Sequence, residues 1–185
     1  DFTNNSRSEN TFMGAYIDMA NNGGCAFGYS SEVRADYGIS VGYAAEITSS
    51  YATAMGYAAY CNGSNGIAVG RQCTTSVSNG IGIGYTSAVS ATGGIGIGFE
   101  STTSGEYGVA IGYQAATTDS ANSIAIGQAA TVSGANSIAI GFGASVTANN
   151  EIYFGNSTTA SIGGVVNWTA TSDARFKNDV RENVG

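Results

Sequence analysis

The sequence contains no proline and no histidine, and only 10% of its 185 residues are charged. Proline is disfavoured wherever backbone N–H groups are needed in a hydrogen-bonded ladder, so its absence favours extended sheet structure. Without histidine, convergent metal ligands are scarce, and we expect no metal site and no cofactor. No apolar run approaches the roughly 18 residues of a membrane-spanning helix, and no signal peptide opens the chain, which argues against membrane insertion.

Positive charge is also scarce. The net charge is −7, and Arg34 and Arg71 are the only basic residues between Gly14 and Gly155, against eight acidic ones. A surface of this composition gains nothing from the release of phosphate counterions. Nucleic-acid binding is therefore disfavoured.

Glycine, in contrast, is abundant and recurs at a fixed spacing. Residues 122–127 read Asn-Ser-Ile-Ala-Ile-Gly, and the same six residues return at 136–141. The glycine that ends each copy, called here the anchor glycine, recurs at a constant spacing, except that the step from Gly112 to Gly127 is longer by one. We therefore expect one extra residue near residues 117–120. A short fixed period over most of a chain predicts a solenoid. The anchor glycines are Gly14, Gly28, Gly42, Gly56, Gly70, Gly84, Gly98, Gly112, Gly127, Gly141 and Gly155.

Apolar residues alternate with others on both sides of each anchor glycine. In most coils Ile, Val or a similar residue stands three and one positions before it, a small residue stands three after, and Val, Ile or Thr stands five after. Period-two alternation predicts two short strands per coil. Glycine would form one turn, because a Cβ would be forbidden there, and a polar stretch such as residues 133–136 would form the other. We therefore predict an all-β parallel β-roll of about eleven 14-residue coils, with inward residues stacked Ile on Ile and Ala on Ala.

The three cysteines are Cys25, Cys61 and Cys73, at repeat positions that mostly hold Ile, Val or Ala. We interpret them as small buried thiols. A disulfide between Cys61 and Cys73 is the alternative, but their repeat positions differ by two, which strains the narrow distance window of a disulfide.

The residue directly after the anchor glycine is aromatic in seven coils. A thin roll leaves apolar surface uncovered, and an exposed apolar line of this length would be sticky. One interpretation is a structural ladder covered by a neighbouring chain, and the other is an aromatic platform for sugars. The residues of this aromatic ladder are Tyr29, Tyr43, Tyr57, Tyr85, Phe99, Tyr113 and Phe142.

The Asn-Ser-Ile-Ala-Ile-Gly repeats, each followed shortly by Ala-x-Val, resemble the head of YadA-type trimeric adhesins. Residues 11–155 carry the resemblance, which is most specific at 122–146. It implies a left-handed parallel β-roll and a homotrimer of three chains side by side. In that case the aromatic ladder would form the trimer seam. Bacterial surface adhesins and phage fibres both use such heads.

Residues 1–10 are polar and are expected to form a leader, and residues 156–171 read as a short β connector. Because the chain does not begin with Met, we interpret it as part of a longer protein.

The last segment, residues 172–185, resembles the opening of the intramolecular chaperone domain of phage tailspikes, endosialidases and tail fibres. In that family the domain helps three chains fold and then cuts itself off. Ser172 and Lys177 match the nucleophile and the base of its Ser-Asp-x-Arg-x-Lys motif, and a partly desolvated lysine can activate a serine. The resemblance implies one autoproteolytic cut between residues 171 and 172, and the alternative is a solvated charged tail. The segment is much shorter than that domain, so we expect a truncated start of it.

Together these observations favour a structural and receptor-binding segment of a trimeric fibre, most consistent with a phage or phage-like tail fibre. The head of a bacterial cell-surface trimeric adhesin is the alternative, and a self-cleaving precursor is a second alternative. We expect no turnover enzyme. The expected partners are two further copies of the chain and a cell-surface glycan or protein receptor, at a location on a virion tail fibre or on the cell surface.

Overall fold

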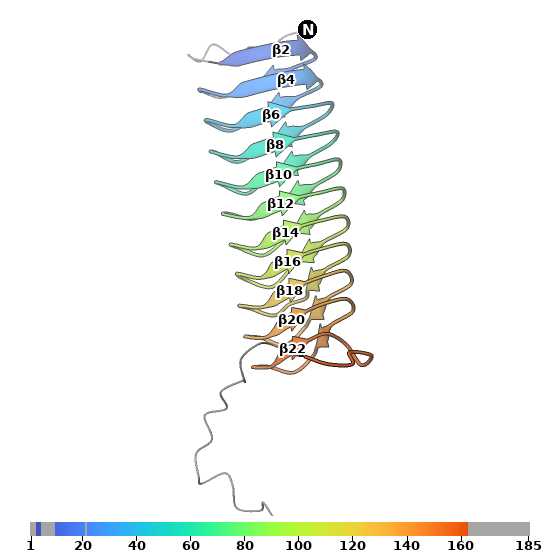
Figure 1. The fold of residues 1–185 in the computed structure, drawn as a ribbon. Helices are drawn as coiled ribbons and strands as arrows, with labels where there is room; N and C mark the ends of the chain where they lie inside the picture. Colours follow the sequence, from blue (N-terminus) through green and yellow to red (C-terminus); the bar gives the residue numbers. More distant parts are fainter. Residues whose placement is uncertain (1–2, 5–9, 21, 163–185) are drawn as a thin grey trace, which may run out of the picture.

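The computed structural model describes residues 3–4, 10–20 and 22–162, and these residues form one stack of parallel coils (Figure 1). Each coil contributes one strand to each of two parallel eleven-stranded sheets, and consecutive strands of each sheet come from consecutive coils. The predicted all-β parallel roll is thereby confirmed. No helix able to cross a membrane occurs in the described part of the chain.

The two sheets differ in strand length. The front sheet, which faces the viewer in Figure 1, consists of β2 (Thr11–Ala15), β4 (Cys25–Tyr29), β6 (Ile39–Val41), β8 (Thr53–Met55), β10 (Ile67–Val69), β12 (Ile81–Ile83), β14 (Ile95–Ile97), β16 (Val109–Ile111), β18 (Ile124–Ile126), β20 (Ile138–Ile140) and β22 (Ile152–Phe154). The back sheet consists of two-residue strands: β1 (Thr3–Asn4), β3 (Asp18–Met19), β5 (Glu32–Val33), β7 (Glu46–Ile47), β9 (Tyr60–Cys61), β11 (Thr74–Thr75), β13 (Ala88–Val89), β15 (Thr102–Thr103), β17 (Ala116–Thr117), β19 (Thr131–Val132) and β21 (Ser145–Val146).

The strand register follows the anchor-glycine spacing. Ile67 of β10 pairs with Ile81 of β12, one regular repeat further on, whereas Val109 of β16 pairs with Ile124 of β18, which is one position beyond a regular repeat. Thr103 and Thr117 still pair at the regular spacing, so the extra residue lies after Thr117. The predicted insertion near residues 117–120 is therefore confirmed, and the turn absorbs it without disturbing either sheet.

From Gly42 on, each anchor glycine directly follows a front strand, where the chain turns toward the back sheet, whereas Gly14 and Gly28 lie within β2 and β4. Gly84 has φ of +140°, and a Cβ placed on it would lie 2.2 Å from the carbonyl oxygen of Gly98 in the next coil. Both the conformation and the close approach exclude a side chain. The requirement for glycine here was predicted from its spacing alone.

The interior of the solenoid is lined by small side chains. Ala68 in the middle of β10 is fully buried, as are Cys73 and Thr75 of the facing half-coil. The sheets approach so closely that a Cβ on Gly82 would come within 2.9 Å of the Cys73 sulfur. Three-residue strands therefore direct only their small middle residue inward.

The isoleucines were expected inside, and this prediction is wrong. Ile39 is 44% exposed and Ile83 is 39% exposed, because the positions three and one before the anchor glycine face outward. The predicted alternation has the correct period but the wrong phase on the front sheet. On the back half of the coil the phase is correct, since Ala45 and Ile47 are fully buried.

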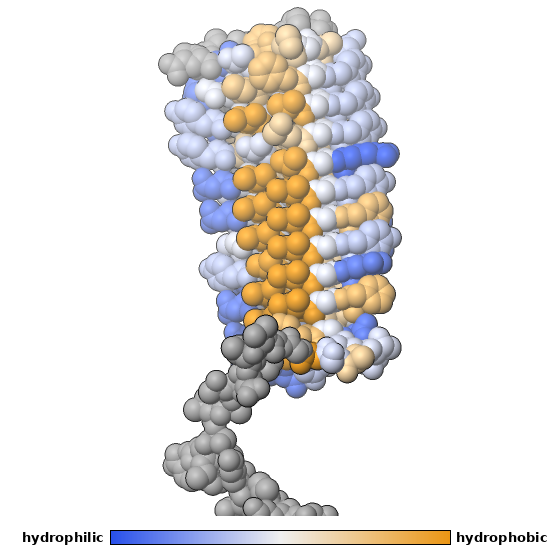
Figure 2. Space-filling view, viewed as in Figure 1, coloured by the Kyte–Doolittle hydropathy of each residue, from blue (hydrophilic) through white to orange (hydrophobic). Residues whose placement is uncertain are grey.

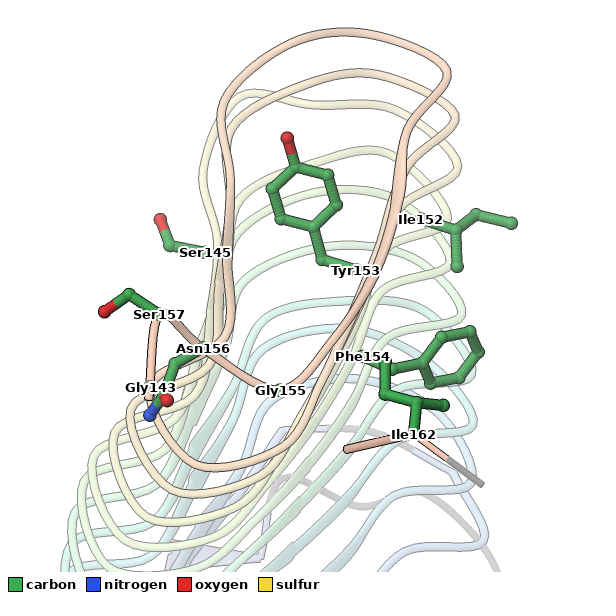
Figure 3. A pocket seen from close by; sticks show the side chains of 9 residues that line it. All are labelled: Gly143, Ser145, Ile152, Tyr153, Phe154, Gly155, Asn156, Ser157 and Ile162. Carbon is green, nitrogen blue, oxygen red and sulfur yellow. The ribbon is translucent and has the colours of Figure 1, made fainter. Parts of the chain in front are cut away.

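Both ends of the solenoid carry an aromatic residue at the inward position that holds Ala, Gly or Ser in the coils between. Phe12 of β2 packs against the buried core. Tyr153 of β22 lies across the inside of the last coil, while Ile152 and Phe154 point away from it (Figure 3). A repeat array needs distinct terminal units to cover its open ends, and these rings serve that purpose.

Candidate interaction surfaces

A double column of apolar side chains covers the outer face of the front sheet. Figure 2 shows it as a continuous band that runs along the axis of the solenoid, across the strands. At about 4.8 Å per coil, the six coils that carry it without interruption extend over about 25 Å. We call it the apolar stripe, and it comprises Ile67, Val69, Ile81, Ile83, Ile95, Ile97, Val109, Ile111, Ile124, Ile126, Ile138 and Ile140.

The aromatic ladder runs parallel to this stripe, on the far side of the anchor-glycine column. Tyr29, Tyr43 and Tyr57 form one stacked series, with ring centroids 5.3 and 5.1 Å apart and rings within 7° of parallel. Tyr85, Phe99 and Tyr113 form a second, with centroids 5.1 and 5.0 Å apart. The sequence prediction placed these rings in one column, and the structure brings them into contact.

Arg71 occupies the ladder position between the two aromatic series. Its guanidinium carbon lies 5.6 Å from the ring centroid of Tyr57 and 5.3 Å from that of Tyr85. Cation–π contact on both sides thus joins the two series into one column from Tyr29 to Tyr113. Sequence reasoning noted Arg71 as a rare cation but missed this role, although its position directly after Gly70 was available as a signal.

The ring stacking ends at Tyr113, before the C-terminal end of the aromatic ladder. Gln128 stands in the ladder position after Tyr113, and Phe142 beyond it is 66% exposed. Among the described residues Phe142 has no ring contact, so it does not belong to the stack.

Stacking constrains what the ladder can bind. Each ring between Tyr29 and Tyr113 has a neighbour over each face, which leaves its edges for contact with solvent. Sugars that bind aromatic platforms do so against an open ring face. The stacked part of the ladder offers the hydroxyl-bearing edges of the tyrosines instead.

A second, shorter aromatic stack lies at the opposite turn of the coil and was missed by the sequence analysis. Tyr37 and Tyr51 are 5.2 Å apart at 16°. Both residues have positive φ, at 59° and 61°, in a column that is otherwise mostly Asn or Gly. Their separation by one regular repeat was the signal that could have identified them.

An acidic group occupies the N-terminal part of the back sheet. Asp18, Glu32 and Glu46 are register partners on β3, β5 and β7. Arg34 forms ion pairs with Glu32 and, at 3.4 Å, with Glu46. Partial burial raises the pKa of Glu32, against the opposing effect of Arg34. In the described part of the chain, no set of three or more Cys, Asp or Glu side chains is placed to hold a metal ion.

The cysteines are free thiols in the structure. Cys61 and Cys73 are fully buried, as predicted, and burial raises the pKa of both, that of Cys73 to about 11. Cys25 is only half-buried. Burial was the wrong prediction for Cys25 because its position, three before Gly28, faces outward on the front sheet.

A shallow hollow lies at the C-terminal end of the solenoid, between the last coil and the chain that leaves it. Tyr153, Asn156 and Ser157 line its polar side (Figure 3). On the other side Ile162 lies near Ile152 and Phe154, beside the end of the apolar stripe. The predicted Ser172 and Lys177 pair lies outside the described residues.

Comparison with known proteins gives a consistent result in sequence and in fold. Residues 48–72, 90–115 and 120–144 match the model of the YadA head domain repeat. The crystal structure of the collagen-binding domain of the Yersinia adhesin YadA superposes with a TM-score of 0.58 at 23% identity, covering 85% of this chain and 80% of that one. No curated protein sequence matches the chain. This solenoid is therefore similar to the YadA head in its fold, and it carries YadA-type head repeats in those three segments.

Proposed function

We propose that this chain is the receptor-binding head of a homotrimeric surface fibre, in which three solenoids pack side by side through their apolar stripes. The apolar stripe is the observation that carries the proposal. Solvent-exposed patches of this continuity on soluble chains are typically interaction sites. The interior holds mostly small side chains, so most of the isoleucines lie on the outer face of the front sheet and remain available for contact between copies.

The regular spacing of the stripe supports a partner with the same repeat. Every coil from Ile67 to Ile140 presents the same two positions, so a second copy of the chain matches it coil for coil. A single face used by every copy closes most simply around a rotation axis. We propose three copies in the assembly because of the similarity to the YadA head.

The aromatic ladder would then line the margin of the trimer seam. The column of anchor glycines separates the ladder from the stripe, and the rings of the ladder from Tyr29 to Tyr113 already stack on neighbours within the same chain. We accordingly propose that the apolar stripe forms the centre of the trimer seam. The aromatic ladder, which the sequence analysis predicted to be the seam itself, would lie at the edge of that seam.

Three aspartate substitutions in a single coil separate these possibilities. Ile83→Asp places a charge in the stripe, Tyr85→Asp places it in the ladder, and Ser90→Asp places it on the exposed back face. Mass should be measured by light scattering after size exclusion. We expect a trimer for the parent and for Ser90→Asp, and dissociation for Ile83→Asp. Dissociation of Tyr85→Asp alone would move the seam to the ladder, and a monomeric parent would overturn the proposal.

Packing through the front sheet leaves the back sheet and the coil edges free for a receptor on a cell surface. The YadA domain to which this fold is similar is described as collagen-binding, so collagen is one candidate among protein receptors. Binding to immobilised triple-helical collagen, with heat-denatured collagen as control, tests it. Equal binding to both would indicate a generic rather than a triple-helix-specific contact.

The tail-fibre assignment is the second candidate, and it rests on the Ser-Asp-x-Arg-x-Lys motif at Ser172 and Lys177. In the full-length gene product, Ser172→Ala should stay intact while the parent is cut between residues 171 and 172. Identical cleavage of both proteins would reject the Ser-Lys assignment. A coiled-coil stalk and membrane anchor in the complete protein would favour the bacterial adhesin instead.

A further inference from the structure

We infer that Arg71 is the centre of a binding site for a terminal acidic sugar, at the midpoint of the aromatic ladder. The inference deepens the proposed function, on which it rests only in taking the protein to be a receptor-binding head. It names the chemistry of one receptor group and the residue that recognises it.

The first observation is that Arg71 is held in place but has no charged partner. Tyr57 and Tyr85 lie on either side of its guanidinium, at 5.6 and 5.3 Å. Within the described residues, the guanidinium makes no ion pair and no hydrogen bond. Arg34, the other basic residue in the described part of the chain, is paired with Glu32 and Glu46. Cation–π contact uses the faces of a guanidinium, so the five N–H donors of Arg71 remain available.

The second observation is the absence of any acidic residue near Arg71 along the rod. The sequence contains no Asp or Glu between Glu46 and Glu100, so the nearest acidic coils are two away on each side, about 10 Å. In a side-by-side trimer, equivalent coils lie at the same height. The described part of a neighbouring copy would therefore bring no carboxylate to the level of Arg71. Its guanidinium would then stay unpaired by these residues in the proposed trimer as well, which argues against a purely structural role.

The third observation concerns the kind of anion that fits. The protein carries a net charge of −7, so a polyanion would meet repulsion along most of its length. A ligand with one acidic group at its end would place a single charge on Arg71, the one unpaired cation among the residues that the structure describes. Planar carboxylates match the guanidinium fork in a bidentate geometry.

The tyrosines on both sides of Arg71 favour a sugar over an acidic peptide. Tyr57 is 50% exposed and Tyr85 is 36% exposed, and their ring faces are covered by stacking. Their phenol edges can both donate and accept hydrogen bonds, as sugar hydroxyls require. The site thus combines one cation with flanking hydroxyls, which suits a sialic or uronic acid at a glycan terminus.

The test uses the whole protein and defined saccharides: sialyllactose, a glucuronic-acid-terminated trisaccharide, sulfated lactose, and lactose as the neutral control. Binding should be measured by calorimetry or saturation-transfer NMR. We expect binding of the carboxylated sugars, reduced by added salt, with lactose at least about tenfold weaker because it lacks the charge-assisted hydrogen bonds. Preferential binding of sulfated lactose would overturn the carboxylate assignment and identify a sulfate site on the same residue.

Three variants locate the binding. Arg71→Gln removes the charge and mimics Gln128, which occupies the same ladder position; it should weaken binding at least about tenfold. Arg71→Lys keeps the charge but lacks the planar guanidinium fork, so its affinity for the acidic saccharides should lie between those of Arg71→Gln and the parent. Arg34→Gln, the matched control, should bind as the parent does.

Unchanged binding by Arg71→Gln, equal binding of lactose, or preferential binding of a Glu-terminated peptide would each overturn the inference. A trimer that binds none of the acidic saccharides at millimolar concentration would also overturn it, while leaving the proposed head function in place. A monomeric parent that binds them through Arg71 would support the inference and overturn the trimer.

Discussion

Replacing Gly84 by alanine tests the close packing of the coils most directly. At φ of +140° alanine is strained by about 1–3 kcal/mol. The new Cβ would also lie 2.2 Å from the Gly98 carbonyl oxygen, so the two backbones must separate by about 1 Å to reach ordinary contact. That movement stretches the 2.8 Å hydrogen bond from the Gly98 N–H to the Ile83 carbonyl, worth about 1 kcal/mol. We expect Gly84→Ala to lower the free energy of unfolding by about 2–4 kcal/mol.

Urea unfolding followed by far-ultraviolet circular dichroism measures this loss, and the chain supplies two matched comparisons. Gly143 also has positive φ, at 60°, but a Cβ there meets only the Asn156 side chain at 3.6 Å, and alanine occupies the equivalent position at Ala129 with φ of 55°. Gly143→Ala should change the unfolding free energy by less than about 1 kcal/mol. The loss of unfolding free energy in Gly141→Ala should lie between those of Gly84→Ala and Gly143→Ala, since its Cβ would approach Gly155 only to 3.1 Å. Equal urea midpoints for Gly84→Ala and Gly143→Ala would show that close packing of the coils does not decide the cost of a side chain at Gly84.

Three further predictions concern the buried and terminal side chains. Iodoacetamide should modify Cys25 in the folded protein and spare Cys61 and Cys73 until urea is added, as judged by mass spectrometry; early modification of Cys73 would contradict its burial. Because burial raises the pKa of the Cys73 thiol from 9.0 to about 11, the unfolded chain loses its proton first, so stability should fall as pH rises from 9 to 11. Cys73→Ala should reduce this dependence of stability on pH. An unchanged dependence would mean that other titrating groups cause it. Tyr153→Ala should speed amide exchange in β22 but not in β10, and uniform acceleration would show that the ring does more than cover the end.

The coil count, the strand positions and the extra residue could all be predicted, because each depends on spacing. A backbone that repeats with a constant period imposes the same dihedral angles at Gly84 and at Gly98, so one recurring glycine reports the whole lattice. The inserted residue after Thr117 was visible for the same reason.

The orientation of the front strands could not be predicted from hydrophobicity alone. Ile95 and Ile97 are more apolar than the glycine between them, and a hydrophobic rule places the larger residues inside. The deciding signal was size, because even a Cβ on Gly96 would lie only 3.1 Å from the side chains of Ser87 and Val89, which leaves no space for a large side chain. Arg71 was missed for a related reason: charge was considered as a surface property and not as a stacking partner for Tyr57 and Tyr85.

The same size argument links folding to assembly. A buried alanine such as Ala68 contributes far less transfer free energy than an isoleucine, which gives about 1.5–3 kcal/mol when fully removed from water. Most of that larger gain lies on the outer face of the front sheet, and a single chain leaves it unused. If copies cover the stripe, the thermal midpoint must rise with protein concentration, as mass action requires for a folded state that exists mainly as an oligomer. We expect such a rise across a hundredfold dilution series in differential scanning fluorimetry, and we expect Ile83→Asp to abolish it. A midpoint independent of concentration in the parent would mean that the narrow interior is sufficient for folding and that the stripe serves another partner.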